Sequence, residues 1–446
     1  MLNLGHRRLS FPTVLTVSFL LMILIGSSLL MLPIAGAHGQ ATDFIDALFV
    51  STSAVCVTGL TTVTTATHWS FFGQVVLAIL VEVGGLGFMT FAVMLANLMR
   101  HRLSFGARML TEESLNLDHP SQLRVIRLII RLSLLIQLGG AALLFCDFGP
   151  RFGWAKGLWY SVFHAVTAYC NAGFDLFGPS LVGLNHDPFV LMVIALLICA
   201  GSFGFLVWRD ILTYHRRHRI TLHTRLALVS GGLILGLSII AFLISEHNLS
   251  QFSDRLNAGQ RLANTIFLAV TPRTAGFFSV PYPQLSTAGL IITIVLMFIG
   301  GTPGSTAGGI KTNTVAVLFL QCIATFRGQE ASFHHRRFAR EDVTRALTLF
   351  VSAIGLLLLA VLILAMTQPL PTHDGVTAVI FEAVSAFGTV GLTLGLTPHL
   401  TILGKLIIIL LMFIGRVGLY TFMFSIFHNH STTHTYCYPK ERIIIG

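Results

Sequence analysis

Long apolar segments constrain this chain more than any other feature of its sequence. The clearest lie at residues 11–32, 71–98, 125–145, 188–208, 226–244, 286–299, 346–366 and 403–427. A helix needs roughly 20 apolar residues to cross a hydrocarbon layer of about 30 Å. Only 10% of the 446 residues are charged, whereas soluble domains carry about 25%. The sequence therefore predicts an all-α polytopic membrane protein.

Basic residues gather in short clusters, and these clusters give the chain its expected orientation. They lie at 7–8, 100–127, 215–219, 334–340 and 440–442. Cytoplasmic loops of membrane proteins carry an excess of Lys and Arg. We therefore expect a multi-pass protein of the cell membrane with both termini in the cytoplasm. The net charge of +10 is then an orientation signal, with contacts to membrane lipid or protein as a second role and no nucleic-acid partner.

The six cysteines show no Cys-x-x-Cys spacing, and most lie in or beside apolar segments. We expect buried thiols rather than a disulfide framework or a zinc site.

Four short, semi-polar stretches recur along the chain, and each ends near a glycine. They read DALFVSTSAVCVTGL, GLWYSVFHAVTAYCNAGF, ANTIFLAVTPRTAGF and TAVIFEAVSAFGTVGL, and the aligned glycines are Gly59, Gly173, Gly276 and Gly391. A second motif, GGLG, GSFG, GGTP or GRVG, begins 24 to 28 residues after each glycine. Two markers that recur four times in register indicate an internal repeat.

Each repeat reads as a membrane helix, a half-spanning helix, a glycine turn and a second membrane helix. Irregular backbone at membrane depth is tolerated only inside protein or beside a water-filled cavity. Four such returns around one axis would line a pore with carbonyl groups, which can replace the hydration shell of a monovalent cation. For GGLG and GSFG, close helix packing is the favoured interpretation of the glycines.

The predicted fold class is therefore four pseudo-symmetric helix–pore loop–helix repeats around one pore, with eight spanning helices and four re-entrant pore loops. The expected boundaries are 1–105, 106–210, 211–326 and 327–427 for repeats 1 to 4, with a cytoplasmic tail at 428–446.

The motifs SAVCVTGL, YCNAGFD, TPRTAGF, SAFGTVGL and GGTPGSTAGGIKT resemble the membrane subunit of Ktr/Trk-type potassium uptake systems. The ending YPKERIIIG and the chain length are similar to the Ktr branch (KtrB) of the Trk/Ktr/HKT superfamily. The resemblance covers essentially the whole chain. It implies a bacterial channel-like transporter rather than an enzyme, with K⁺ as substrate and no covalently bound cofactor.

The resemblance implies one filter glycine in each repeat, with further carbonyl layers from the two residues before it. The predicted filter residues are Val57, Thr58, Gly59, Asn171, Ala172, Gly173, Thr274, Ala275, Gly276, Thr389, Val390 and Gly391. All four segments depart from the Thr-Val-Gly-Tyr-Gly sequence of a potassium channel. We therefore expect looser selectivity, with Na⁺ as a competitor or activator.

The stretch GGTPGSTAGGIKT, residues 300–312, has the composition of a phosphate-binding loop, but Ile310 separates Gly309 from Lys311 and no strand precedes it. We predict instead a helix that breaks at mid-membrane and resumes near Thr312. The resemblance implies that this stretch is an intramembrane gate beneath the filter. The predicted gating residues are Gly300, Gly301, Gly304, Ser305, Thr306, Ala307, Gly308, Gly309, Lys311 and Arg416.

Two arginines stand in unusual places. Arg416 lies within an apolar stretch, where a charge costs at least about 2.5–3.5 kcal/mol on insertion scales. The residues alone leave two interpretations open, a charge below the filter or an ion pair with Glu82, and the resemblance favours the first. Arg273 is expected to point behind the filter toward a carboxylate, Glu382 or Asp175.

The membrane potential is the expected driving force, because the sequence shows no nucleotide-binding fold. The resemblance implies a homodimer and a cytoplasmic nucleotide-binding regulatory ring (KtrA-like), through which ATP or ADP acts, with docking surfaces around Arg108, Arg217 and Arg337. The alternative within transport is a Trk-type proton- or sodium-coupled potassium symporter. An intramembrane enzyme would need paired acids or a metal constellation at membrane depth, and a membrane scaffold would leave the four repeats without a reason.

Overall fold

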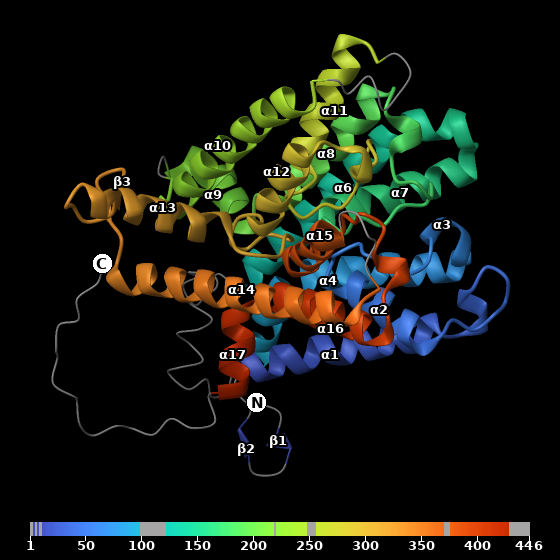
Figure 1. The fold of residues 1–446 in the computed structure, drawn as a ribbon, viewed down its shortest axis with the longest axis horizontal. Helices are drawn as coiled ribbons and strands as arrows, with labels where there is room; N and C mark the ends of the chain where they lie inside the picture. Colours follow the sequence, from blue (N-terminus) through green and yellow to red (C-terminus); the bar gives the residue numbers. More distant parts are fainter. Residues whose placement is uncertain are drawn as a thin grey trace.

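The computed structural model is largely helical and describes residues 3–4, 7–8, 11–98, 122–217, 220–247, 256–369 and 375–427 (Figure 1). The long helices are α1 (Phe11–Leu30), α4 (Phe71–Leu98), α6 (Gln122–Phe152), α10 (Leu222–Ser245) and α14 (Arg340–Thr367). The helices that precede the four glycine turns are α2 (Phe44–Val55), α7 (Trp154–Cys170), α11 (Ala258–Val270) and α15 (Gly375–Gly388).

The other described α-helices lie between these helices and after them. They are α3 (Thr65–His68), α8 (Pro188–Ser202), α9 (Phe205–Arg217), α12 (Thr287–Phe298), α13 (Thr312–Phe326), α16 (Ile402–Val417) and α17 (Leu419–Phe427). Two antiparallel pairs of two-residue strands join β1 (Asn3–Leu4) to β2 (Arg7–Arg8) and β3 (Ser332–Phe333) to β4 (Arg336–Arg337).

Within the described residues, four helices have the length and apolar composition to cross a membrane. They lie in α1, α6, α10 and α14, and each is the first span of one predicted repeat. A fifth span results if α8 and α9 are counted together. The largely helical, membrane-type architecture is confirmed, and the count of eight spans stays a prediction.

Two stretches expected as continuous spans, 188–208 and 403–427, are each divided into two helices. The axis bends by 93° between α8 and α9, and Gly204 at the break has a φ of 77°. Gly418, with a φ of 91°, separates α16 from α17. A glycine in this backbone region ends a helix because the left-handed conformation cannot continue it.

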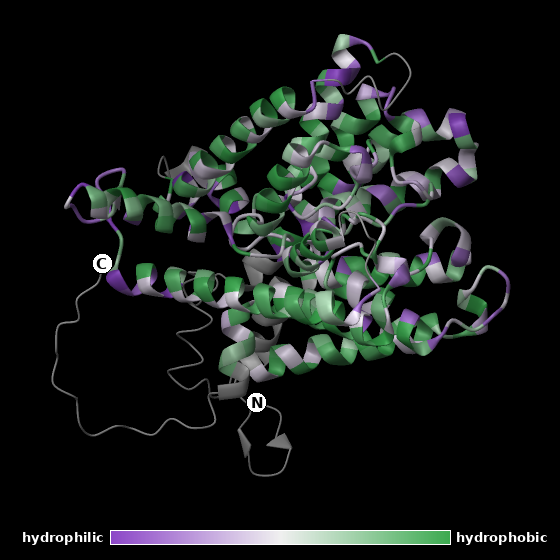
Figure 2. Ribbon diagram, in the orientation of Figure 1, coloured by the Kyte–Doolittle hydropathy of each residue, from purple (hydrophilic) through white to green (hydrophobic). Residues whose placement is uncertain are grey.

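Apolar side chains cover the outside of the long helices as well as the core. Leu135, Ile244 and Met366 on α6, α10 and α14 are each more than two-thirds exposed. Figure 2 shows hydrophobic residues along most of each long helix and hydrophilic ones mainly at helix ends and loops. Such a surface suits a lipid environment, because lipid tails are as apolar as these side chains.

The first and last parts of the chain lie side by side. Helix α16 packs against α2, and α17 crosses α1 (Figure 1). The Lys405 ammonium of α16 lies 2.6 Å from the Asp46 carboxylate of α2. Of the expected repeat boundaries, 210/211 lies inside α9, 326/327 and 427/428 coincide with helix ends, and 105/106 lies outside the described residues.

Candidate functional site

Four loops meet at one place in the molecule, one after each of α2, α7, α11 and α15. Every loop contains a glycine with positive φ and, two positions earlier, a non-glycine residue with positive φ. These pairs are Val57 and Gly59, Asn171 and Gly173, Thr274 and Gly276, and Thr389 and Gly391. A non-glycine residue in this region costs of order 1–3 kcal/mol and persists only where its surroundings impose it. The same costly turn therefore occurs at all four predicted filter positions.

The four glycines form a closed ring. A Cβ atom added to Gly59 would overlap the carbonyl oxygen of Ala172, and one on Gly173 would meet that of Ala275. A Cβ on Gly276 would overlap the carbonyl oxygen of Val390, and one on Gly391 that of Thr58, which returns to the first loop. The structure thus brings the predicted filter residues together, each loop edge to edge with the next.

No charged side chain belongs to the twelve predicted filter residues. Nine of them are buried, and the three half-buried exceptions are Gly59, Gly173 and Gly391. Outside the ring, a cavity of about 210 Å³ lies against Gly59 and Gly173. Thr61, Thr62 and Asp175 help to line it. Threonine hydroxyls and a carboxylate are oxygen ligands of the kind that attract a hydrated cation toward the carbonyl ring.

Hydroxyl groups hold two of the loops from behind. Ser53 Oγ accepts a hydrogen bond from the amide of Gly59 at 2.9 Å, and Ser385 Oγ accepts one from the amide of Gly391 at 3.1 Å. Both serines lie six residues before their glycine. The third loop departs from this pattern, because Val270 occupies that position and Thr271 donates instead to the carbonyl of Phe277. This support by hydroxyl groups was not predicted from the sequence, although the shared six-residue spacing between serine and glycine could have indicated it.

Two buried polar residues lie nine positions before their glycines and tie the loops to the outer segments. His164 Nδ1 lies 2.7 Å from the carbonyl of Tyr160, and its Nε2 accepts from the amide of Leu176 at 3.3 Å. Glu382 accepts from the hydroxyls of Thr393, at 2.8 Å, and Thr397. Neither role was predicted from sequence.

The predicted partners of Arg273 are wrong. Glu382 is already bound by threonines, and Asp175 accepts from the amides of Phe177 and Gly178 at 2.9 and 2.7 Å. The Arg273 guanidinium points the other way, toward α10, where Nη1 lies 3.4 Å from the carbonyl of Gly231.

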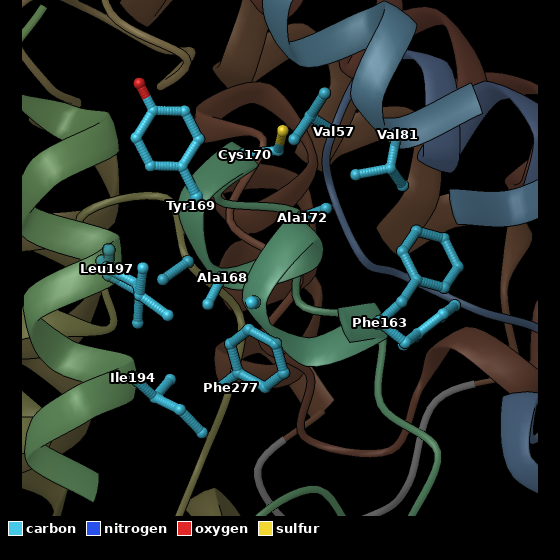
Figure 3. Packing of buried hydrophobic residues seen from close by; sticks show 14 of the residues in the cluster. Val57, Val81, Phe163, Ala168, Tyr169, Cys170, Ala172, Ile194, Leu197 and Phe277 are labelled. Carbon is cyan, nitrogen blue, oxygen red and sulfur yellow. The ribbon is translucent and has the colours of Figure 1, made fainter. Parts of the chain in front are cut away.

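The second loop shows how tightly this region is packed (Figure 3). Ile194 and Leu197 of α8 lie on one side of the end of α7, and Val57 and Val81 lie on the other. Ala172, at the turn itself, is fully buried. Such dense surroundings supply the constraint that holds the strained turn in place.

The stretch 300–312 forms the predicted break between α12 and α13. Its two ends lie together, since the amide of Gly300 donates to the carbonyl of Ile310 at 2.8 Å and the amide of Thr312 donates to that of Gly301 at 3.0 Å. Lys311 Nζ donates back to the carbonyl of Ala307 at 2.5 Å. The loop is thus closed on itself at the base.

The tip of the same loop lies against the second and fourth of the predicted filter loops. Thr306 Oγ1 donates to the carbonyl of Tyr169 at 3.3 Å and lies 3.3 Å from the Asn171 amide group. A Cβ on Gly308 would overlap the side chain of Thr389. Nine of the ten predicted gating residues belong to this loop and therefore lie beside the predicted filter loops, and the tenth is Arg416.

The second glycine motif has one spatial role in three of the four predicted repeats. A Cβ on Gly84, Gly201 or Gly415 would overlap a carbonyl oxygen four residues before the ring glycine, that of Val55, Tyr169 or Phe387. Close packing, as favoured for GGLG and GSFG, is confirmed. In the third repeat, Gly300 instead meets the carbonyl of Gly308, so the loop occupies the corresponding space.

Arg416 connects this loop to α4. Its guanidinium is buried and donates to the carbonyl of Thr306 and to those of Gly84 and Gly85, at 2.6 and 3.2 Å. The alternative prediction for Arg416, an ion pair with Glu82, is wrong. The Glu82 carboxylate instead accepts hydrogen bonds from Gln137 at 2.9 Å and from the Cys170 thiol at 3.2 Å. Three carbonyl groups are the partners of the buried charge.

Comparison with known proteins gives consistent matches along the chain. The family described as "TrkH: Cation transport protein" matches residues 11–432. "Potassium/sodium uptake protein NtpJ" of Enterococcus hirae is 47% identical over 445 residues, which cover 99% of this chain and 98% of that protein. "Ktr system potassium uptake protein B" of Bacillus subtilis is 38% identical, with 98% and 97% covered.

Among solved structures, the crystal structure of the potassium transporter TrkH from Vibrio parahaemolyticus is similar, with a TM-score of 0.73. Sequence identity is 16%, and the match covers 95% of this chain and 86% of that one. The two proteins share a fold.

Proposed function

The chain belongs to the TrkH family of cation transport proteins, and on that premise we propose that it takes up potassium across the cell membrane through the ring of Gly59, Gly173, Gly276 and Gly391. The observation that carries this function is the closed ring of backbone carbonyls, in which each loop abuts the next. Backbone carbonyls replace the water around a monovalent cation, so an uncharged ring of this kind suits K⁺. Relatives named as potassium or potassium/sodium uptake proteins support the choice of ion.

The four loops belong to four pseudo-symmetric repeats with eight spans. Helices α1, α6, α10 and α14 form the first span of each repeat, and the second spans begin with α4, α8, α12 and α16. The two positions before each ring glycine add carbonyl layers. Sodium competes with potassium or activates its uptake, because the single glycine in each loop departs from the potassium-channel sequence.

The loop 300–312 acts as the gate, with Arg416 as its anchor. It lies against two filter loops and is fixed to α4 through the guanidinium. Moving the loop away would require these hydrogen bonds to break, so the bonds hold the proposed gate in its described position.

The functional protein is a homodimer that binds a cytoplasmic ring, through which ATP or ADP acts, and both termini are cytoplasmic. The name of the Bacillus subtilis relative, a component of a Ktr system, supports this assembly. Arg337 of β4 is an exposed docking candidate, whereas Arg108 and the tail 428–446 lie outside the described residues and the side chain of Arg217 is not described.

Rubidium uptake into liposomes tests the function. Liposomes loaded with potassium and diluted into medium free of potassium and sodium develop an interior-negative potential if the protein conducts. A potential of 100 mV is worth about 2.3 kcal/mol per charge, so we expect tracer rubidium to accumulate roughly 40- to 50-fold. Protein-free liposomes with valinomycin are the positive control.

Rubidium accumulation that follows an imposed sodium or proton gradient, and that equal sodium concentrations on both sides do not produce, would replace this proposal with the coupled symporter. Absence of rubidium movement under every gradient, also when the regulatory ring protein is added, would refute uptake altogether.

A further inference from the structure

A small cavity behind the third filter loop contains a buried arginine with almost no partner. The cavity measures about 120 Å³ and lies between α8, α10 and the end of α11. Ser202, Gly231, Val270 and Arg273 are among its lining residues. The cation pathway described above does not include this space.

The charge of Arg273 is poorly compensated. The side chain is 8% exposed, and its single hydrogen bond to a described residue is the 3.4 Å contact with the Gly231 carbonyl. Its Nε is buried and has no hydrogen-bond partner among the described residues, and none of their carboxylates forms an ion pair with it. A buried charge without a partner is strongly unfavourable, so a ligand with negative charge would stabilise this arrangement.

We propose that the cavity binds a small monovalent inorganic anion, chloride under cellular conditions, which neutralises Arg273. The volume equals that of about four water molecules, so an ion with a few waters fits and a phospholipid headgroup does not. A guanidinium offers five N–H donors, and a halide accepts hydrogen bonds from any direction. Gly231 leaves room for this arrangement, since even a Cβ there would lie 3.7 Å from Arg273 Nη2.

The anion would lie against Arg273 and Ser202, two lining residues that connect the cavity to the predicted filter loops and to the loop 300–312. Arg273 directly precedes Thr274 of the third filter loop. Ser202 lies in the same cavity wall and contacts both elements. Its carbonyl accepts a hydrogen bond from the amide of Thr302 at 3.2 Å, and the Ser202 hydroxyl lies 2.8 Å from the Asn171 amide group. An anion here would not be transported. It would neutralise Arg273 and stabilise the cavity wall that contacts the predicted filter loops and the loop 300–312.

Anomalous diffraction from crystals of the full-length protein grown in sodium bromide tests the site directly. We expect a bromide peak in this cavity for the wild type and for Arg261→Met, which removes an exposed arginine of α11 outside the cavity. Arg273→Met should lose the peak, whereas Arg273→Lys should keep it because the charge remains.

Three results would overturn the proposal. The first is wild-type crystals that show bromide at surface sites but none in the cavity. The second is a bromide peak in the cavity that persists in Arg273→Met. If Arg273→Met fails to fold, the wild type decides: its melting temperature should be higher in bromide than in gluconate at equal ionic strength, and equal melting temperatures are the third contrary result. None of these results depends on potassium uptake.

Discussion

Two separate features require glycine at each ring position: the positive φ of its backbone and the lack of space for a side chain beside the next loop. Gly276 has a φ of 78°, and a Cβ there would overlap the carbonyl oxygen of Val390. Gly39 has a similar φ of 68° but has nothing within 4 Å of a Cβ. These two glycines therefore separate the effect of backbone strain from the effect of contact within the ring.

Gly276→Ser should lower the apparent affinity for rubidium by about tenfold or more, because the new side chain would displace the Val390 carbonyl. A loss of only about 1.4 kcal/mol in the free energy of ion binding lowers the affinity tenfold. The measurement is the concentration dependence of rubidium uptake in liposomes. Gly39→Ser carries comparable strain and should leave the affinity unchanged. Equal losses in both variants would contradict the contact with the ring as the cause.

Arg416→Gln should raise rubidium flux in the absence of any partner protein. The shorter, neutral side chain loses both the positive charge and the hydrogen bond to the Thr306 carbonyl that anchors the loop. Arg416→Lys keeps the charge without the guanidinium fork, so it separates electrostatic from anchoring effects. Arg340→Gln, at the exposed start of α14, is the control. Flux that stays equal or falls in Arg416→Gln would contradict the gating role.

At the scale of elements, the loop 300–312 is the clearest departure from four equal units. Deleting residues 304–309 should raise the flux of the liposome assay, because the deletion removes the part of the loop that contacts Tyr169 and Thr389. Thr306→Val, which loses the hydroxyl bond alone, should act in the same direction with a smaller effect. A well-folded deletion variant without increased flux would show that this loop does not limit conduction.

The sequence could predict the long helices and the four turns, because apolar length and repeated glycines are local signals. It could not predict the breaks at Gly204 and Gly418, since a glycine in an apolar run serves close packing equally well. The hydrogen-bond partners of the two buried arginines could not be predicted either. Arg273 and Arg416 both donate to backbone carbonyls, and every residue has a carbonyl, so the sequence does not indicate which one is the partner.

At the scale of the whole molecule, segments far apart in the sequence build one site. The ring closes between the fourth loop and the first, at Gly391 and Thr58, and the Asp46–Lys405 ion pair also joins these two parts of the chain, through α2 and α16. Ion passage would therefore depend on all four loops at once, and no single repeat would form a pathway alone.

The position of a bound ion tests this account most directly. Crystals of the full-length protein in rubidium chloride should give an anomalous rubidium peak inside the ring of Gly59, Gly173, Gly276 and Gly391, at coordination distance from several loop carbonyls. The peak should weaken when potassium replaces rubidium. A ring without rubidium, or rubidium bound only to side chains elsewhere in the membrane region, would contradict the proposal that these four loops form the ion pathway.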